Sequence, residues 1–209
     1  MIAIIDYEAG NLTSVEQAVK KLGFRCRITQ RVEELLEAES IIFPGVGAAG
    51  RAMASLRRLG LDDALKRAFY MGKPILGICL GAQIVLERSE EDETQCLGLI
   101  PGTVRRFPHP LLSPDGKKLK IPHMGWDTVT FTKRHPVIDG VPDSSEFYFV
   151  HTYYPAPASE EYVLGKTKYG IAFASVIAHK NFVAVQFHLE KSGRPGLKIL
   201  KNFCEWAFR

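Results

Sequence analysis

The chain has 209 residues, 46% of them hydrophobic, and no Ser/Gly-rich or Pro-rich stretch divides it, so we expect one domain over residues 1–209. Its 27 basic and 23 acidic residues are interspersed without the long Lys/Arg block of a nucleic-acid arm, which argues against a nucleic-acid partner. The apolar run at residues 2–5 is too short for a signal peptide and no run of about 18 apolar residues follows, so we expect a soluble, cytoplasmic protein without a membrane partner.

Short apolar runs alternate with helical patterns through the first half of the sequence. The runs predict strands at residues 2–5, 25–28, 40–43 and 74–78. The helical patterns predict helices over residues 12–22, 52–70 and from 80 to about 87. This alternation favours an α/β fold, with a mostly parallel sheet covered by helices on both faces. Reactive side chains should then gather beyond the carboxyl ends of the strands.

The second half is richer in β-structure. It predicts strands at residues 128–131, 146–150, 172–177 and 182–187, and a closing helix from about residue 196. Proline, aspartate and glycine at residues 108–116 predict a turn-rich surface loop between the halves.

The four cysteines stand at positions 26, 79, 96 and 204, without the paired spacing of metal ligands or the density of a disulfide scaffold. We therefore expect no metal site and no disulfide. Most single cysteines are small buried hydrophobic residues, so a chemical role for any of them needs further support.

Cys79 has that support, because Gly77-Ile78-Cys79-Leu80-Gly81 lies between a predicted strand and a predicted helix. This is the pattern of a nucleophile elbow with cysteine in place of serine. A position at a helix N-terminus stabilises the thiolate, and the amide of Leu80 can face a developing oxyanion. The alternative is a glycine-flanked cysteine of the core.

His188 follows the buried-strand pattern at residues 182–187 and is the candidate base for Cys79. Glu190 comes two residues later. If the chain stays extended there, both side chains point to the same side, and Glu190 can orient the imidazole. The alternative for Glu190 is a capping or solvent-facing carboxylate.

A glycine-rich loop follows the predicted strand at residues 40–43 and contains a G-x-G-x-x-G pattern at residues 45–50. A dinucleotide site is disfavoured, because two strands precede the pattern and no carboxylate stands at residues 66–70, about 20 residues further on. We expect the loop, with Val46 and Gly47, to supply a backbone amide to an oxyanion hole. An ordinary tight turn is the alternative.

Taken together, the chain resembles the class I, or triad, glutamine amidotransferases over essentially its whole length. GICLGAQ at residues 77–83 is similar to the family's nucleophile motif, and QFHLEKS at 186–192 to its His/Glu motif. Four further segments resemble one branch of the family, the glutaminase subunits of imidazole glycerol phosphate synthase: DYEAGN at 6–11, PGVG at 44–47, PHMGWD at 122–127 and YFVHTYY at 148–154.

This resemblance implies a flavodoxin-like fold and a single type 1 amidotransferase domain. It implies that Cys79 attacks the side-chain amide of glutamine, that His188 transfers the proton and that Glu190 orients His188, with no cofactor and no metal. By matching positions, Gln83 and Glu91 become candidates for binding glutamine. The alternatives are an exposed helical residue for Gln83 and a solvated acidic helix end for Glu91.

The resemblance also implies a partner, a cyclase (synthase) subunit in a heterodimer, to which the ammonia passes. Matching positions place Asn11, Trp126, Tyr148 and Lys191 at or near the partner face, although the two aromatic residues could equally belong to the core.

Three departures from the family pattern remain. Leu189 replaces the usual Pro, Asp127 the usual Asn, and Glu8 the usual Gly.

The competing functions are a glutaminase subunit of another ammonia-using synthase, such as a paralogue in surface-sugar biosynthesis, and a non-catalytic scaffold subunit with the same fold.

Overall fold

In the computed structural model, residues 1–8 and 12–207 are described. Eight strands form the main sheet, in the spatial order β11-β14-β15-β16-β4-β3-β1-β2. Five neighbouring strands run parallel: β16 (Phe182–Val185), β4 (Ile75–Cys79), β3 (Ser40–Gly45), β1 (Ile2–Ile5) and β2 (Cys26–Thr29). The predicted parallel sheet is therefore confirmed, and β4 lies between β16 and β3, near the middle of the eight strands.

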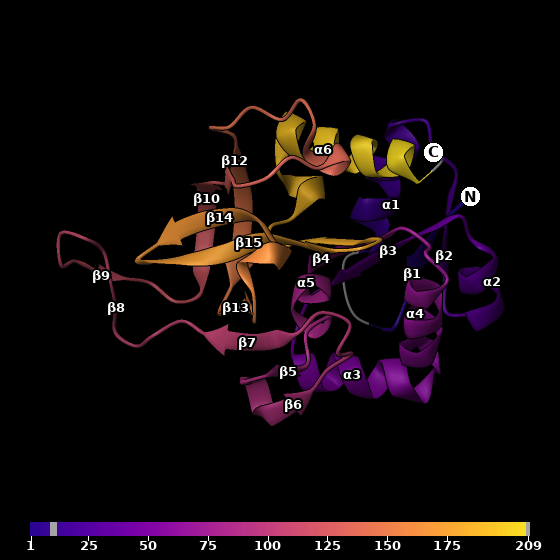
Figure 1. The fold of residues 1–209 in the computed structure, drawn as a ribbon, viewed down its shortest axis with the longest axis horizontal. Coiled ribbons are helices and arrows are strands. Elements are labelled where there is room, and N and C mark those ends of the chain that lie inside the picture. Colours follow the sequence, from indigo (N-terminus) through magenta and orange to yellow (C-terminus); the bar gives the residue numbers. More distant parts are fainter. Residues whose placement is uncertain (9–11, 208–209) are drawn as a thin grey trace.

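Helices cover both faces of this sheet, as the alternating pattern predicted (Figure 1). One face carries α1 (Leu12–Lys21) and α6 (Gly193–Trp206), whose buried residues share a core with Ile4 and Val183. The other carries α2 (Val32–Glu37), α3 (Ala49–Arg58), α4 (Leu61–Tyr70) and α5 (Leu80–Ile84). No helix in the described part of the chain has the length and apolar character to cross a membrane.

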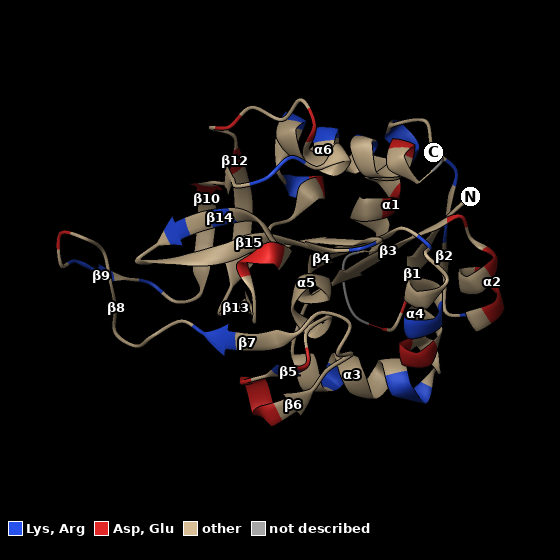
Figure 2. Ribbon diagram, in the orientation of Figure 1, with Lys and Arg blue, Asp and Glu red and all other residues tan. Residues whose placement is uncertain are grey.

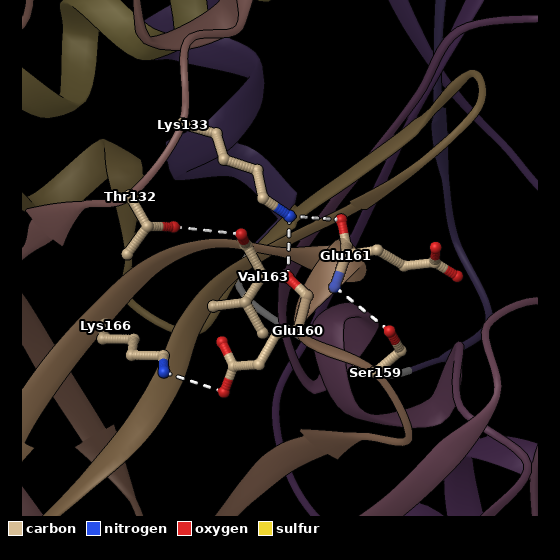
Figure 3. Close-up of polar contacts among 7 residues, drawn as sticks. All are labelled: Thr132, Lys133, Ser159, Glu160, Glu161, Val163 and Lys166. Carbon is tan, nitrogen blue, oxygen red and sulfur yellow. Dashed lines mark hydrogen bonds and ion pairs between the residues drawn. The ribbon is translucent and has the colours of Figure 1, made fainter.

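The main sheet continues into an antiparallel region formed by the second half of the chain. Its strands are β15 (Ile171–His179), β14 (Val163–Tyr169) and β11 (Thr130–Phe131). Thr132 Oγ1 donates to the carbonyl of Val163 at 3.1 Å, and Lys133 Nζ donates to the carbonyls of Glu160 and Glu161 at 2.7 Å (Figure 3). These bonds fix the short edge strand β11 to the start of β14.

Smaller sheets flank the carboxyl ends of the parallel strands. One pairs β10 (His123–Thr128) with β12 (Glu146–His151). Another has the order β13-β7-β5-β6, with bounds Tyr153–Pro157, Gly102–Arg106, Arg88–Ser89 and Thr94–Gln95. The loop predicted at residues 108–116 leads into a projecting hairpin of β8 (Leu111–Leu112) and β9 (Lys118–Leu119) (Figure 1).

Two predicted helices differ from the structure. The helix expected over 52–70 is two helices, because Gly60 adopts a left-handed conformation with φ 67° between α3 and α4. The helix expected from 80 to about 87 ends at Ile84, because the following residues turn into β5, and the amide of Glu87 bonds the carbonyl of Gly102. Among the described residues there are also four short 3₁₀ helices: η1 (Glu91–Glu93), η2 (Pro136–Ile138), η3 (Glu160–Tyr162) and η4 (Leu189–Lys191).

Charged residues of both signs are spread over the described ribbon (Figure 2).

Candidate active site

Cys79 ends β4 and directly precedes α5 at the centre of the sheet. Its backbone has φ 54° and ψ −104°, a conformation that L residues rarely adopt, as expected of a sharp strand-to-helix turn. The flanking glycines have no room for a side chain. A Cβ at Gly81 would overlap the carbonyl oxygen of Phe43, and a Cβ at Gly77 would lie 2.9 Å from the Cβ of Ala184. Close packing therefore fixes the position of Cys79.

His188 and Glu190 follow β16, the parallel neighbour of β4, so the sheet brings them to the same edge as Cys79. His188 Nδ1 lies 2.8 Å from Glu190 Oε1, and the two side chains are 5% and 4% exposed. Burial alone lowers the pKa of His188, but its interactions with Cys79 and Glu190 outweigh burial and raise that pKa to about 10. The imidazole next to the sulfur is thus held in its protonated form.

The route by which Glu190 reaches His188 differs from our expectation. The chain does not stay extended after His188, because residues Leu189–Lys191 form the 3₁₀ turn η4. Ser192 fixes this turn, since its hydroxyl donates to the carbonyl of His188 and accepts from the amide of Tyr148. The turn folds Glu190 back over the imidazole, and Leu189 is fully buried beneath it.

The glycine-rich loop leaves β3 beside Cys79, because Gly45 and Cys79 are register partners. A Cβ at Gly45 would overlap the hydroxyl oxygen of Tyr7, so only glycine fits there. Val46 is 41% exposed and Gly47 has φ 97°. At the far end, Glu91 Oε2 accepts a 2.6 Å hydrogen bond from the amide of Ala49. Glu91 therefore anchors the loop and is not the solvated helix end of the alternative reading.

These residues surround one cavity of about 310 Å³. Most of the site residues expected from the sequence line it: Val46, Gly47, Cys79, Leu80, Gln83, Glu91 and His188. The rest of the cavity lining is Pro122 and residues 150–153, which the sequence did not predict to line a pocket. Within residues 1–8 and 12–207, no three His, Cys, Asp or Glu side chains are arranged to hold a metal ion.

The family profile for "Glutamine amidotransferase class-I" matches residues 3–206. The chain belongs to this family.

Relatives of this amidotransferase match over its whole length. It is 48% identical over 207 residues to the imidazole glycerol phosphate synthase subunit HisH of Nitratidesulfovibrio vulgaris strain DP4, covering 99% of this chain and 97% of the relative. The subunit of the same name from Maridesulfovibrio salexigens is 49% identical, with the same coverage. That from Neisseria meningitidis serogroup A is 46% identical, covering 98% of this chain and 99% of the relative.

Solved structures share the fold at low sequence identity. The amidotransferase superposes on a crystal structure of a glutamine amidotransferase with a TM-score of 0.77, at 19% identity and full coverage of both chains. It also superposes on a chain of the PurLQS structure from Thermotoga maritima with a TM-score of 0.74, at 16% identity, covering 98% and 97% of the two chains. These likenesses establish the class I amidotransferase fold.

Gln83 is not the exposed helical residue of the alternative reading, because it is only 5% exposed. Its Nε2 donates to the carbonyl of Tyr153 at 2.8 Å and to Oε1 of Gln186 at 3.0 Å. Gln186 is fully buried, and its own Nε2 lies 3.7 Å from the Cys79 sulfur. Gln186 had no predicted role, although its place two residues before His188 in a buried strand pattern was a usable signal.

The residues matched to the partner face form a separate cluster next to His188. The rings of Trp126 and Tyr148 meet edge to face with centroids 5.9 Å apart, and Lys191 Nζ lies 5.8 Å from the Tyr148 ring centroid. Trp126 is 53% exposed and so does not belong to the core. Asn11, the fourth residue of this set, lies outside the described residues.

Proposed function

We propose that this amidotransferase is the glutaminase subunit of an imidazole glycerol phosphate synthase, with Cys79, His188 and Glu190 as its catalytic triad. The observation that carries the proposal is the cysteine at a strained elbow beside a buried, protonated His188–Glu190 pair. The relatives named as HisH subunits, similar over almost the whole chain, support the choice of synthase.

In the proposed reaction, the thiol proton of Cys79 already resides on His188, and the Cys79 thiolate attacks the side-chain amide carbon of glutamine. His188 then gives the proton to the departing nitrogen, so that ammonia leaves and a thioester remains. Water, deprotonated by His188, attacks the thioester; the C–S bond breaks, glutamate is released, and the Cys79 thiolate and protonated His188 are restored. Glu190 orients the imidazole and stabilises its positive charge.

The backbone of the pocket supports this chemistry. The amide of Leu80 and a backbone amide from Val46 or Gly47 are the proposed donors to the oxyanion. The loop that carries Val46 and Gly47 contains a glycine with positive φ, which permits a rearrangement when the partner is loaded. A loop misaligned at rest would couple glutamine hydrolysis to the partner.

Gln83 and Glu91 are the proposed glutamine-binding side chains. Both line the cavity that contains Cys79. The carboxylate of Glu91 complements the α-ammonium group of glutamine in charge, and Gln83 holds the Tyr153 carbonyl of the pocket wall.

The proposed partner is a cyclase subunit in a heterodimer, which uses the ammonia to form imidazole glycerol phosphate and aminoimidazole carboxamide ribonucleotide. Trp126, Tyr148 and Lys191, together with Asn11, are the proposed contact residues. An exposed tryptophan packed edge to face against a tyrosine has the aromatic composition of an interface centre.

The test is glutamate release from glutamine by the purified chain, with and without the cyclase subunit and its nucleotide ligand. Turnover should require the loaded partner. It should disappear in Cys79→Ser and persist in the control Cys26→Ser, whose half-buried cysteine lies on β2. Absence of turnover in the loaded complex would refute the proposed function.

A further inference from the structure

A buried hydrogen-bond network extends from the pocket wall toward the surface of β10. His151 Nδ1 lies 2.8 Å from the carbonyl oxygen of Tyr153, and His151 Nε2 lies 2.9 Å from His123 Nδ1. His123 Nε2 in turn lies 2.7 Å from Oδ2 of Asp127. His123 and His151 are 1% and 6% exposed, so these bonds are shielded from water.

The same Tyr153 carbonyl accepts the hydrogen bond from Gln83, and Gln83 bonds Gln186, whose amide reaches the Cys79 sulfur. The bonds therefore form one continuous path from Asp127 to the nucleophile. Asp127 follows Trp126 in β10, and its side chain is 35% exposed. The outer end of the path is thus the partly exposed Asp127, on the opposite face of β10 from Trp126, and the inner end is at Cys79.

The chemistry of the donors fixes the direction of each bond. A carbonyl oxygen only accepts, so His151 Nδ1 carries a proton and donates to Tyr153. Burial lowers the pKa of His151 to about 3, so the ring is neutral and its Nε2 is an acceptor. His123 must then donate through Nδ1. A further proton must lie between His123 Nε2 and Asp127, as either an imidazolium–carboxylate pair or a neutral pair.

Packing holds His123 in the orientation that this path needs. Its ring stacks between Phe149, with centroids 4.8 Å apart, and Tyr169, with centroids 4.0 Å apart. Rotation of the ring out of its plane would break both stacks, and a half-turn within that plane would break the hydrogen bonds to His151 and Asp127.

We propose that His123 and Asp127 are positioning residues for the glutaminase site, which act through His151, the Tyr153 carbonyl, Gln83 and Gln186 on the sulfur of Cys79. Asp127 supplies the proton partner of His123 Nε2, His123 holds His151 in the tautomer that donates to Tyr153, and the Tyr153 carbonyl fixes the amide of Gln83. The inference rests on the proposed function, because the property that it explains is the placement of the nucleophile for glutamine.

Two substitutions of His123 separate this role from packing. His123→Phe keeps a flat ring for stacking but removes the donor to His151. His123→Asn loses the ring but places an amide nitrogen where His123 has Nδ1. Glutamate release is measured in the complex with the loaded cyclase subunit, together with the thermal midpoint of each variant.

The network predicts that His123→Phe lowers kcat about tenfold, with a smaller effect on KM, and that His123→Asn stays within about threefold of wild type. Asp127→Asn should also retain activity, because its amide can donate to His123 Nε2, whereas Asp127→Leu should lose part of it. The opposite order, with His123→Phe active and His123→Asn impaired in step with its thermal midpoint, would show that His123 acts only by packing.

A second readout does not depend on the partner. The rate at which iodoacetamide alkylates Cys79 is followed by mass spectrometry, with Cys26 on β2 as the internal control. The rate at Cys79 should change in His123→Phe and not in His123→Asn, while Cys26 reacts equally in all variants. Unchanged alkylation of Cys79 in His123→Phe would overturn the inference. An inactive wild-type complex would instead overturn the proposed function, whatever the alkylation rates show.

Discussion

Replacing Glu190 by Gln tests the electrostatic core of the proposed mechanism. Glutamine has nearly the same shape and keeps an acceptor oxygen, but it carries no charge. The side chains of His188 and Glu190 are only 5% and 4% exposed, so water is largely excluded from their contact, and His188 Nδ1 lies 2.8 Å from Glu190 Oε1. At an effective dielectric constant of about 20, unit charges about 4 Å apart interact by about 4 kcal/mol.

That energy corresponds to about three pKa units. In Glu190→Gln, the pKa of His188 should therefore fall from about 10, although the interaction with Cys79, which also raises this pKa, remains. Because about 1.4 kcal/mol changes a rate tenfold, and part of the hydrogen bond survives, kcat should fall about 10²- to 10³-fold. KM should change little, because Glu190 does not line the cavity.

The assay is steady-state glutamate release by the loaded complex between pH 6 and pH 10, with Cys79→Ser as the inactive reference. The alkaline limb of the kcat profile should move to lower pH, because His188 loses its proton earlier. Glu160→Gln is the matched control, since Glu160 pairs with Lys166 and its side chain is 77% exposed. A Glu190→Gln enzyme within threefold of wild type, with an unmoved alkaline limb, would refute the reasoning.

Three further substitutions follow from the site. Gly81→Ala should lower the free energy of unfolding by about 1 to 3 kcal/mol and should also lower kcat, because the new Cβ would overlap the Phe43 carbonyl. Chemical denaturation measures the first effect and glutamate release the second. Tyr7→Phe should leave the free energy of unfolding unchanged or raise it by about 1 kcal/mol, because the Tyr7 hydroxyl is buried and unpaired among the described residues. A lower free energy of unfolding in a denaturant titration would contradict this. Burial lowers the pKa of His151 to about 3, so below pH 6.5 the unfolded chain binds more protons than the folded chain. The free energy of unfolding should therefore fall as the pH drops from 6.5 toward 3, and this fall should be smaller in His151→Gln. Thermal midpoints of both proteins at about pH 7.5 and about pH 4.5 measure the difference.

The sequence predicted the parallel half of the fold well, because its signals are local. β1, β2, β3 and β4 are apolar runs, and each was placed to within two residues at either end. The break at Gly60 was missed because the flanking helices have continuous apolar patterns and a single glycine does not always end a helix. The strands β7, β13 and β14 were missed because their pairing depends on partners distant in sequence.

For the site, the sequence identified the groups and the structure supplied their arrangement. Cys79, His188 and Glu190 stood out because their types and neighbours are unusual. The His151–His123–Asp127 bonds gave no such signal, since each of these residues looks like an ordinary polar residue of a strand. The turn after His188 was also hidden, because it is fixed by Ser192 through contacts with two separate segments.

The order of strands in the sheet has a consequence for synthesis of the chain. β4 carries Cys79, but one of its two neighbours, β16, comes more than 100 residues later. While the ribosome makes the intervening segment, one edge of a fully buried, apolar strand has no partner, which exposes it to aggregation and makes it a ready target for chaperones. Cys79 also lacks its proposed base until residue 188 has been added. The nascent chain therefore carries its proposed nucleophile without the His188–Glu190 pair until both residues have been added.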